Sequence, residues 1–161
     1  MTEKKKSLWT KTEIEDHLRP FAQRLNPNSY FLSAPLSRLA GMKRAHVAIA
    51  RLPAGKDSFA YHAHMIEEEW IYVLFGRAIA SIDGQDVEVG PGDFMGFPTP
   101  SVPHLLKNPF EHELVYLMGG EHQPLDVLEY PTLGKRYLLV STPNGTEFYE
   151  LADPSKPFGP A

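Results

Sequence analysis

Three histidines and a glutamate in the middle of the chain have the side chains and the spacing of a metal site. His62 and His64 stand two residues apart, and Glu69 opens the next apolar run. Residues two apart in a β-strand project from the same face of the sheet, because side chains alternate with a period of two. A hairpin would return the Glu69 carboxylate to the two imidazoles, and His104 begins a later strand-like segment.

Neutral imidazoles and a carboxylate are suitable ligands for a divalent transition metal. Four protein ligands on a six-coordinate ion leave two positions for water, substrate or dioxygen, as in a catalytic rather than a structural site. We therefore predict one divalent metal per chain (Fe, Mn, Ni, Co or Zn), bound by His62, His64, Glu69 and His104. Glu67 and Glu68 compete with Glu69 for the role of carboxylate ligand, and all three would otherwise form a solvated acidic loop.

Composition and charge exclude several classes of protein. The chain has 161 residues, of which 42% are hydrophobic, and this suits one globular domain with a core. No apolar run has the length needed to cross a bilayer. The formal net charge of −4 and the lack of a basic stripe argue against a nucleic-acid partner. No cysteine is available for disulfides or thiolate ligands. Lys4-Lys5-Lys6 precedes no apolar segment, so we predict no secretory signal and a cytoplasmic location.

From Arg44 onward the sequence is typical of short strands separated by turns. Asp83-Gly84 between two such segments favours a hairpin. The predicted strands are 45–52, 59–64, 69–75, 77–82, 85–89, 94–97, 104–108, 113–118, 136–142 and 146–151. Many short strands with regular turns predict an all-β sandwich or barrel.

The rest of the chain divides around this region. Residues 1–43 form an N-terminal segment, in which Thr12-Glu13-Ile14-Glu15 matches a capping box and predicts a short helix. Pro20 should end or kink that helix. Residues 44–151 form the predicted barrel, and 152–161 form a proline-rich tail.

The order of these motifs resembles the cupin superfamily. Its first motif has matches at Gly55, His62, His64, Glu69 and Gly76, and its second at Gly92, Pro98, His104 and Asn108. Pro100 stands where the family usually has glycine. The resemblance implies a double-stranded β-helix, which is a jelly-roll barrel, and is nearest to microbial cupins of the sugar-phosphate-isomerase-like and oxalate-decarboxylase-like kinds. Such cupins are often dimers.

Strand parity predicts which side chains face the barrel interior. If Glu69 points inward, so do Ile71, Val73 and Phe75, while Leu106 and Asn108 follow His104. These residues would line a cavity below the metal. Trp70, Tyr72 and Leu74 would then form an apolar outer face, which either the N-terminal segment or a second subunit must cover. We predict a homodimer.

The predicted site has more than one functional interpretation. The first is a metalloenzyme acting on a small oxygen-rich molecule, such as a sugar or sugar-phosphate isomerase. Its alternatives are an iron-dependent dioxygenase, a small-acid decarboxylase, and a non-catalytic module that binds a small ligand. The sequence assigns no catalytic residue, but Glu67 is a candidate for proton transfer and Asn108 for a hydrogen bond into the cavity. Arg51 and Arg77 are weak candidates for binding a phosphate.

Overall fold

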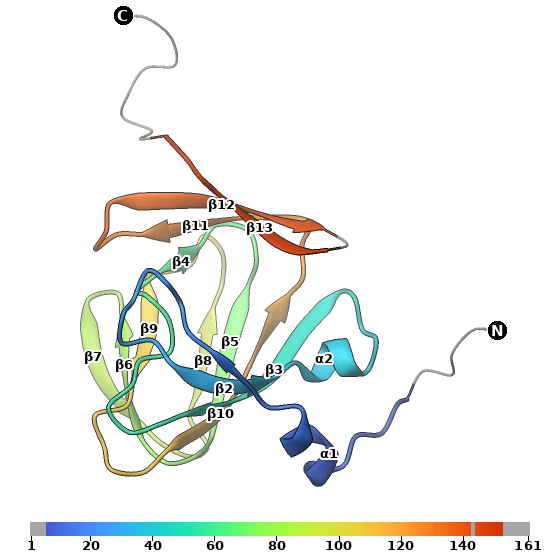
Figure 1. The fold of residues 1–161 in the computed structure, drawn as a ribbon. Coiled ribbons are helices and arrows are strands. Elements are labelled where there is room, and N and C mark those ends of the chain that lie inside the picture. The colour runs from blue at the N-terminus through green and yellow to red at the C-terminus, as the bar shows by residue number, and fades with distance from the viewer. Residues whose placement is uncertain (1–5, 143, 153–161) are drawn as a thin grey trace, which may run out of the picture.

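The protein folds as a jelly-roll β-barrel, which confirms the predicted fold class. A computed structural model describes residues 6–142 and 144–152, and Figure 1 shows its strands wrapped around a common interior. All strand pairs are antiparallel. The predicted proline-rich tail lies, except for its first residue, outside the described residues.

Three sheets make up the architecture. The largest has six strands in the order β1 (Arg19–Phe21), β2 (Phe31–Ala34), β3 (Ala45–Leu52), β10 (Leu114–Glu121), β5 (Glu69–Phe75) and β8 (Phe94–Phe97). The second has the order β13 (Gly145–Glu150), β12 (Lys135–Thr142), β11 (Leu125–Tyr130) and β4 (Ala63–His64). The third has the order β7 (Gln85–Val89), β6 (Ala78–Ile82) and β9 (His104–Lys107). The described residues form two helices, α1 (Lys11–Asp16) and α2 (Leu36–Leu39).

The core lies between the sheets and follows from the alternation along each strand. On β10, Leu114, Tyr116 and Met118 are buried, and the residues between them are only half-buried. β10 pairs with β3 on one side and β5 on the other, so its inward side chains occupy the middle of the barrel. Burial of apolar area on this face is the main favourable contribution to folding.

Two turns are determined by single residues. Asp83 and Gly84 both have positive φ, of 48° and 75°, as the predicted hairpin turn between β6 and β7 requires. Gly76, with φ of 79°, ends β5 at a close approach of two chain segments. A Cβ at Gly76 would lie 2.2 Å from the carbonyl oxygen of Glu113, so no larger residue fits this position.

The N-terminal segment differs from the prediction in two respects. The capping box consists of Thr10 and Glu13, not of residues 12–15, because Thr10 Oγ1 accepts a hydrogen bond from the Glu13 amide and the Glu13 carboxylate accepts one from the Thr10 amide. The segment also contributes β1 and β2, which extend the large sheet beyond β3. Neither these two strands nor β11 were among the predicted strands.

The expected inward position of Phe75 is wrong. Ile71 and Val73 are buried, but Phe75 is 57% exposed. The pairing between β5 and β10 shifts its register here, since Tyr116 lies opposite Val73 while Val115 lies opposite Phe75. A β-bulge of this kind inserts one residue and changes the direction of the side chains that follow.

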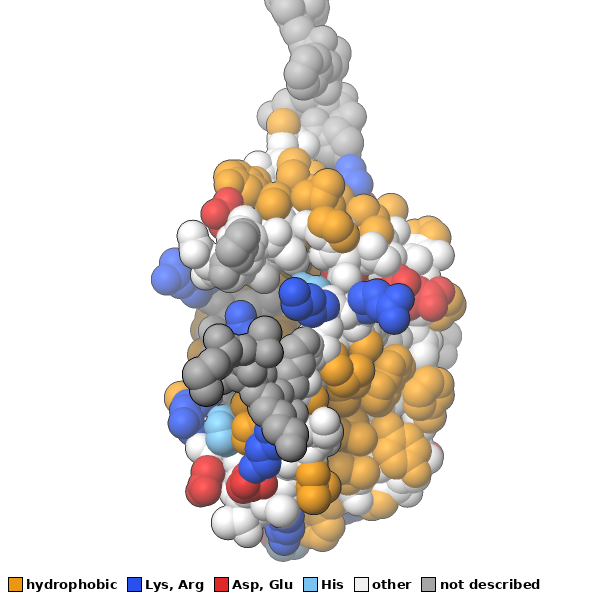
Figure 2. All heavy atoms as spheres, turned by 90° about the vertical axis from the view of Figure 1, so that its right-hand side faces the viewer, with side chains coloured by type: hydrophobic (Ala, Val, Ile, Leu, Met, Phe, Trp, Pro, Cys, Tyr) orange, Lys and Arg blue, Asp and Glu red, His pale blue; other side chains and the backbone are white. Residues whose placement is uncertain are grey.

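The outer face of β5 is apolar and largely exposed. Tyr72 and Leu74 are 38% and 41% exposed, and Phe94 on the neighbouring β8 is 64% exposed. Figure 2 shows hydrophobic side chains gathered over one side of the molecule. Helix α1 lies elsewhere, because Glu15 forms an ion pair with Arg51 on β3 at an N–O distance of 3.2 Å. The described N-terminal residues therefore leave this face of β5 uncovered.

Neither described helix is long and apolar enough to span a membrane.

Candidate metal centre

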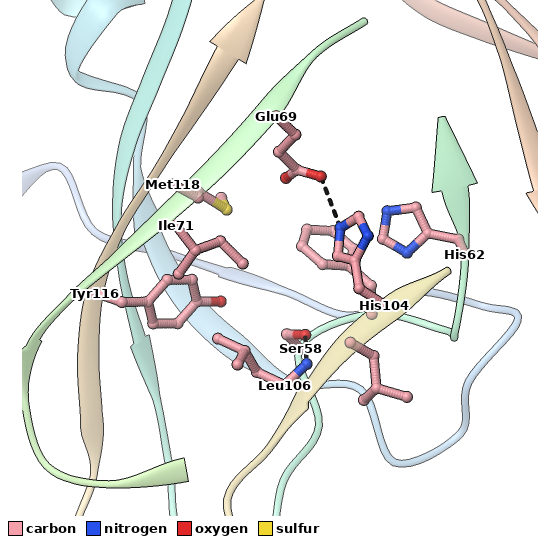
Figure 3. A pocket seen from close by; sticks show the side chains of 10 residues that line it. Ser58, His62, Glu69, Ile71, His104, Leu106, Tyr116 and Met118 are labelled. Carbon is pink, nitrogen blue, oxygen red and sulfur yellow. Dashed lines mark hydrogen bonds and ion pairs between the residues drawn. The ribbon is translucent and has the colours of Figure 1, made fainter. Parts of the chain in front are cut away.

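The four predicted ligands lie together at one end of the barrel interior. His62 Nε2 is 3.2 Å from His64 Nε2, and Glu69 Oε2 lies 3.3 Å from His64 Nε2 and 3.0 Å from His104 Nε2. His62 and His104 are 5% and 3% exposed. Figure 3 shows Glu69 and His104 in contact, with His62 beside them.

Backbone pairing accounts for this convergence. His62 and His104 form an isolated β-bridge, in which the His62 amide donates to the His104 carbonyl and the His104 amide donates to the His62 carbonyl. His64 lies on β4, opposite Leu128 of β11. Phe97, the partner of Glu69 in the large sheet, stacks on the His104 ring at a centroid distance of 3.6 Å. Three sheets thus each hold part of the cluster.

Hydrogen bonds orient all three imidazoles in the same way. Each Nδ1 atom has an oxygen partner: Ala60 O at 2.8 Å for His62, Asp126 Oδ2 at 2.6 Å for His64, and Val102 O at 3.1 Å for His104. A proton on Nδ1 satisfies each of these contacts and leaves the Nε2 lone pair for another partner. Metal-bound histidines are commonly held in this manner by a carbonyl or carboxylate.

The donor set fits a divalent transition metal. Ligand atoms about 2.1 Å from a six-coordinate ion lie roughly 3 Å from their neighbours around it. The pairs His62–His64, His64–Glu69 and Glu69–His104 have distances of 3.0 to 3.3 Å, which match this separation. Ligand atoms of His62, Glu69 and His104 also lie within 4.8 Å of one another. His62, His64, Glu69 and His104 would hold such an ion.

The electrostatics of the cluster favour the protonation states that ligation needs at His62 and Glu69, whereas His64 must lose a proton before it can bind an ion. Burial, together with the nearby His104 ring, lowers the pKa of His62 to about 3, so the His62 ring stays neutral. Burial also disfavours a charge on His64, but the hydrogen bonds with Asp126 and Glu69 prevail and raise its pKa to about 10. Burial alone would raise the pKa of Glu69, yet His104 and His64 hold it well below its usual range. A metal ion would replace the proton on His64.

Asp126 contacts the predicted ligand His64 and was not among the residues predicted for the site. Its carboxylate is 2% exposed and accepts four hydrogen bonds. Oδ2 accepts from His64 Nδ1, and Oδ1 accepts from the amides of Ile66, Glu67 and Val127. Burial would raise the pKa of Asp126, but the bond with His64 and those with the amides keep it lowered. Asp126 therefore holds the Nδ1 side of the His64 ring, which leaves Nε2 directed toward the other predicted ligands.

A pocket inside the barrel borders three of the four predicted ligands, His62, Glu69 and His104. Its cavity volume is ≈ 10 Å³, about the space of one water-sized group, and it is partly open to solvent. The residues around it are Ser58, Phe59, His62, Glu69, Ile71, His104, Leu105, Leu106, Tyr116 and Met118. The pocket has a polar end formed by the ligand side chains and mostly apolar walls.

Asn108 does not line this pocket, contrary to the expectation from parity. It is 1% exposed, but its amide nitrogen donates to the carbonyls of Leu52 and His112, and its amide oxygen accepts from the Phe110 amide. Asn108 thus connects the end of β3 to the loop before β10 through hydrogen bonds to the backbone.

The other candidates also lie away from the pocket lining. The Glu67 carboxylate accepts from the Gln123 amide at 2.6 Å, and burial raises its pKa. Its carboxylate comes within 4.8 Å of ligand atoms of His64 and Asp126. Arg51 pairs with Glu15 and Glu113.

Arg77 is held by contacts of its own. It pairs with Glu88 at 2.8 Å and stacks over Phe110. Neither of the two arginines suggested as phosphate ligands is therefore directed into the pocket.

Comparison with known proteins identifies the family. The family model for the cupin domain matches residues 48–120. An uncharacterized protein of Methanocaldococcus jannaschii is 31% identical over 106 residues, which cover 61% of this chain and 74% of that protein. The chain belongs to the cupin superfamily.

Solved structures of other cupins share the fold. A candidate sugar phosphate isomerase from Acidithiobacillus ferrooxidans superposes with a TM-score of 0.82 at 29% identity, covering 94% of this chain and 97% of that one. A sugar phosphate isomerase of the cupin superfamily from Silicibacter pomeroyi gives a TM-score of 0.73 at 22% identity, covering 84% and 90%. The second likeness supports the fold alone.

Proposed function

We propose that this protein is a metal-dependent enzyme that isomerises a small sugar or sugar derivative. One observation carries the proposal: three Nε2 atoms and one carboxylate oxygen converge within 3.0 to 3.3 Å along the cluster, at the end of an internal pocket. A purely structural barrel has no need of such a set. The likeness to the candidate isomerase of Acidithiobacillus ferrooxidans, over nearly the whole of both chains, supports this choice of reaction.

The residues of the chain would contribute binding and orientation. A divalent ion held by His62, His64, Glu69 and His104 would supply Lewis acidity, which would polarise a carbonyl oxygen of the substrate and acidify the adjacent C–H group. Glu69 provides an anionic ligand that offsets part of the ion's charge. The apolar side chains of Ile71, Leu106 and Met118 exclude water from the pocket, and this strengthens electrostatic interactions inside it.

The pocket suits the chelating end of a substrate better than a phosphate group. None of its lining residues is Lys or Arg, and both Arg51 and Arg77 are engaged in surface ion pairs. We therefore expect a vicinal hydroxyl–carbonyl unit to enter the pocket. A phosphate on the substrate would remain at the mouth and contribute little to affinity.

Proton exchange tests this function directly. Metal-loaded protein is incubated in D₂O with aldose–ketose pairs of three to six carbons, both free and phosphorylated, and proton NMR follows deuterium incorporation and isomer interconversion. Glu69→Gln, which removes the only anionic ligand, is the matched negative control. We expect metal-dependent exchange for at least one pair in the wild type and none in the variant. Turnover of small diacids or catechols without exchange of any sugar would contradict the isomerase proposal.

A further inference from the structure

The hydroxyl of Tyr116 is an unpartnered polar group inside the pocket. Tyr116 is 1% exposed, and its Oη atom has no hydrogen-bond partner among the described residues. The side chain projects inward from β10 and lines the same pocket as His62, Glu69 and His104. Figure 3 shows its hydroxyl directed into the pocket.

An orphan hydroxyl in this position is unfavourable for folding. A buried donor without a partner loses its hydrogen bonds to water and gains none in return. Its neighbours Ile71, Leu106 and Met118 are apolar, so phenylalanine would fill the same space without that penalty. Burial also raises the pKa of Tyr116, and the phenol therefore remains a neutral donor at any ordinary pH.

Tyr130 shows that burial of a tyrosine in this fold does not by itself leave the hydroxyl unpartnered. Tyr130 is also 1% exposed, but its Oη accepts a hydrogen bond from Gln23 Nε2 at 3.1 Å. The two residues thus form a matched pair, one hydroxyl satisfied by the protein and the other left for something that enters the pocket.

We propose that the Tyr116 hydroxyl donates a hydrogen bond to an oxygen of the small molecule bound at the metal, an oxygen other than those that chelate the ion. This makes Tyr116 a specificity residue. The ligand class it selects is a polyhydroxylated compound, with at least one oxygen beyond its chelating pair. The inference rests on the proposed function, since it assumes that a ligand occupies the open positions of the ion.

Two acids that differ by one hydroxyl test the inference. Lactate and glycerate both chelate divalent metals through a carboxylate and the neighbouring hydroxyl, but only glycerate carries a third oxygen function. The full-length protein is loaded with Co(II), and changes in its visible spectrum report the binding of each acid. We expect the wild type to bind glycerate about five- to tenfold more tightly than lactate, the effect of one good neutral hydrogen bond. Tyr116→Phe should abolish this preference by weakening glycerate binding and leaving lactate binding unchanged.

Stability of the ligand-free, Co(II)-loaded protein provides a second readout. Tyr130→Phe should lower the melting temperature, because it breaks the bond with Gln23. Tyr116→Phe should leave the melting temperature unchanged or raise it, because it removes an unsatisfied group. If Tyr116→Phe lowers the melting temperature as Tyr130→Phe does, the hydroxyl has a structural partner and the inference is overturned.

The binding results separate the inference from the function on which it rests. If both acids bind but Tyr116→Phe changes their affinities equally or not at all, the inference is wrong and metal-dependent ligand binding stands. If neither acid alters the spectrum of the Co(II)-loaded wild type, the open metal positions are absent, and both the proposed function and the inference fail.

Discussion

Replacing Asp126 by asparagine should weaken metal binding although Asp126 touches no metal. Its Oδ2 atom accepts the Nδ1 proton of His64 at 2.6 Å, while Oδ1 accepts from the amides of Ile66 and Val127 at 3.0 and 2.8 Å. In Asp126→Asn the backbone amides still require an oxygen acceptor, which forces the new NH₂ group toward His64. Two donors then face each other, and His64 must move its proton to Nε2 or turn away.

The expected loss of metal affinity in Asp126→Asn follows from the lost orientation of His64, one of the four proposed ligands. Loss of an outer partner of a metal-bound histidine typically costs about 10- to 100-fold in metal affinity. This corresponds to roughly 1.4 to 2.8 kcal/mol. We expect Asp126→Asn to fall in this range, and His64→Ala, which removes the ligand itself, to cost more.

Competition against a chromogenic chelator at pH 7.5 measures the change. Asp86→Asn is the matched control, since it removes the same charge from an exposed side chain that contacts Ser81 and Lys107. The control should bind metal as the wild type does. An affinity of Asp126→Asn within twofold of the wild type would refute the orienting role of Asp126.

Three further predictions follow from the same structure. Because the pKa of His64 is raised to about 10, metal binding at pH 7.5 should release about one proton per ion, which pH measurement in weakly buffered solution can detect. In the metal-free protein, the same raised pKa stabilises the fold fully below about pH 6.5, and this stabilisation is lost as the pH rises toward 10. Urea unfolding at several pH values can follow the loss. Gly120→Ala would place a Cβ 2.2 Å from the Glu68 carbonyl oxygen, so it should displace the start of β5. This variant should lower the free energy of unfolding by about 1–3 kcal/mol and reduce the metal content. Gly90→Ala, whose Cβ would have no contact closer than 3.9 Å, should change neither quantity. The uncovered apolar face of β5 suggests a homodimer, so light scattering should give twice the chain mass for the wild type and the single-chain mass for Tyr72→Glu; a wild-type monomer at micromolar concentration would contradict this.

Much of the barrel could be predicted because its strands have local signals. β3, β5, β7 and β8 begin and end where alternation and turn residues indicated. The convergence of the site also has a sequence signal, since His62 and His64 share parity and Glu69 opens a strand. Asp83-Gly84 also indicated the hairpin between β6 and β7, because these residue types readily adopt the positive φ angles of its turn.

Features that depend on pairing between distant segments were not predictable. Asp126 lies 62 residues from His64 on a strand bounded by Pro124 and Pro131, and aspartate is itself unfavourable in strands. Only the pairing of β11 with β4 brings it behind the imidazole. The exposure of Phe75 results from a register shift between β5 and β10, and the residues of neither strand indicate that shift.

Asn108 shows a different limit. Parity correctly placed it inside the protein, at 1% exposure, but parity says nothing about hydrogen-bond partners. The Asn108 side-chain nitrogen donates to the carbonyls of Leu52 and His112, and its side-chain oxygen accepts from the Phe110 amide. Asn108 is thus structural, whereas Tyr116, which is equally buried, has the unpartnered polar group among the described residues.

The metal content of the protein tests the central claim most directly. Elemental analysis after native purification, without added metal, should give close to one divalent transition metal ion per chain for the wild type. The variant carrying both His62→Ala and His64→Ala should contain almost none, while the Asp86→Asn control keeps the wild-type ratio. Full retention of metal in the double histidine variant would contradict the assignment of His62, His64, Glu69 and His104 as the metal site.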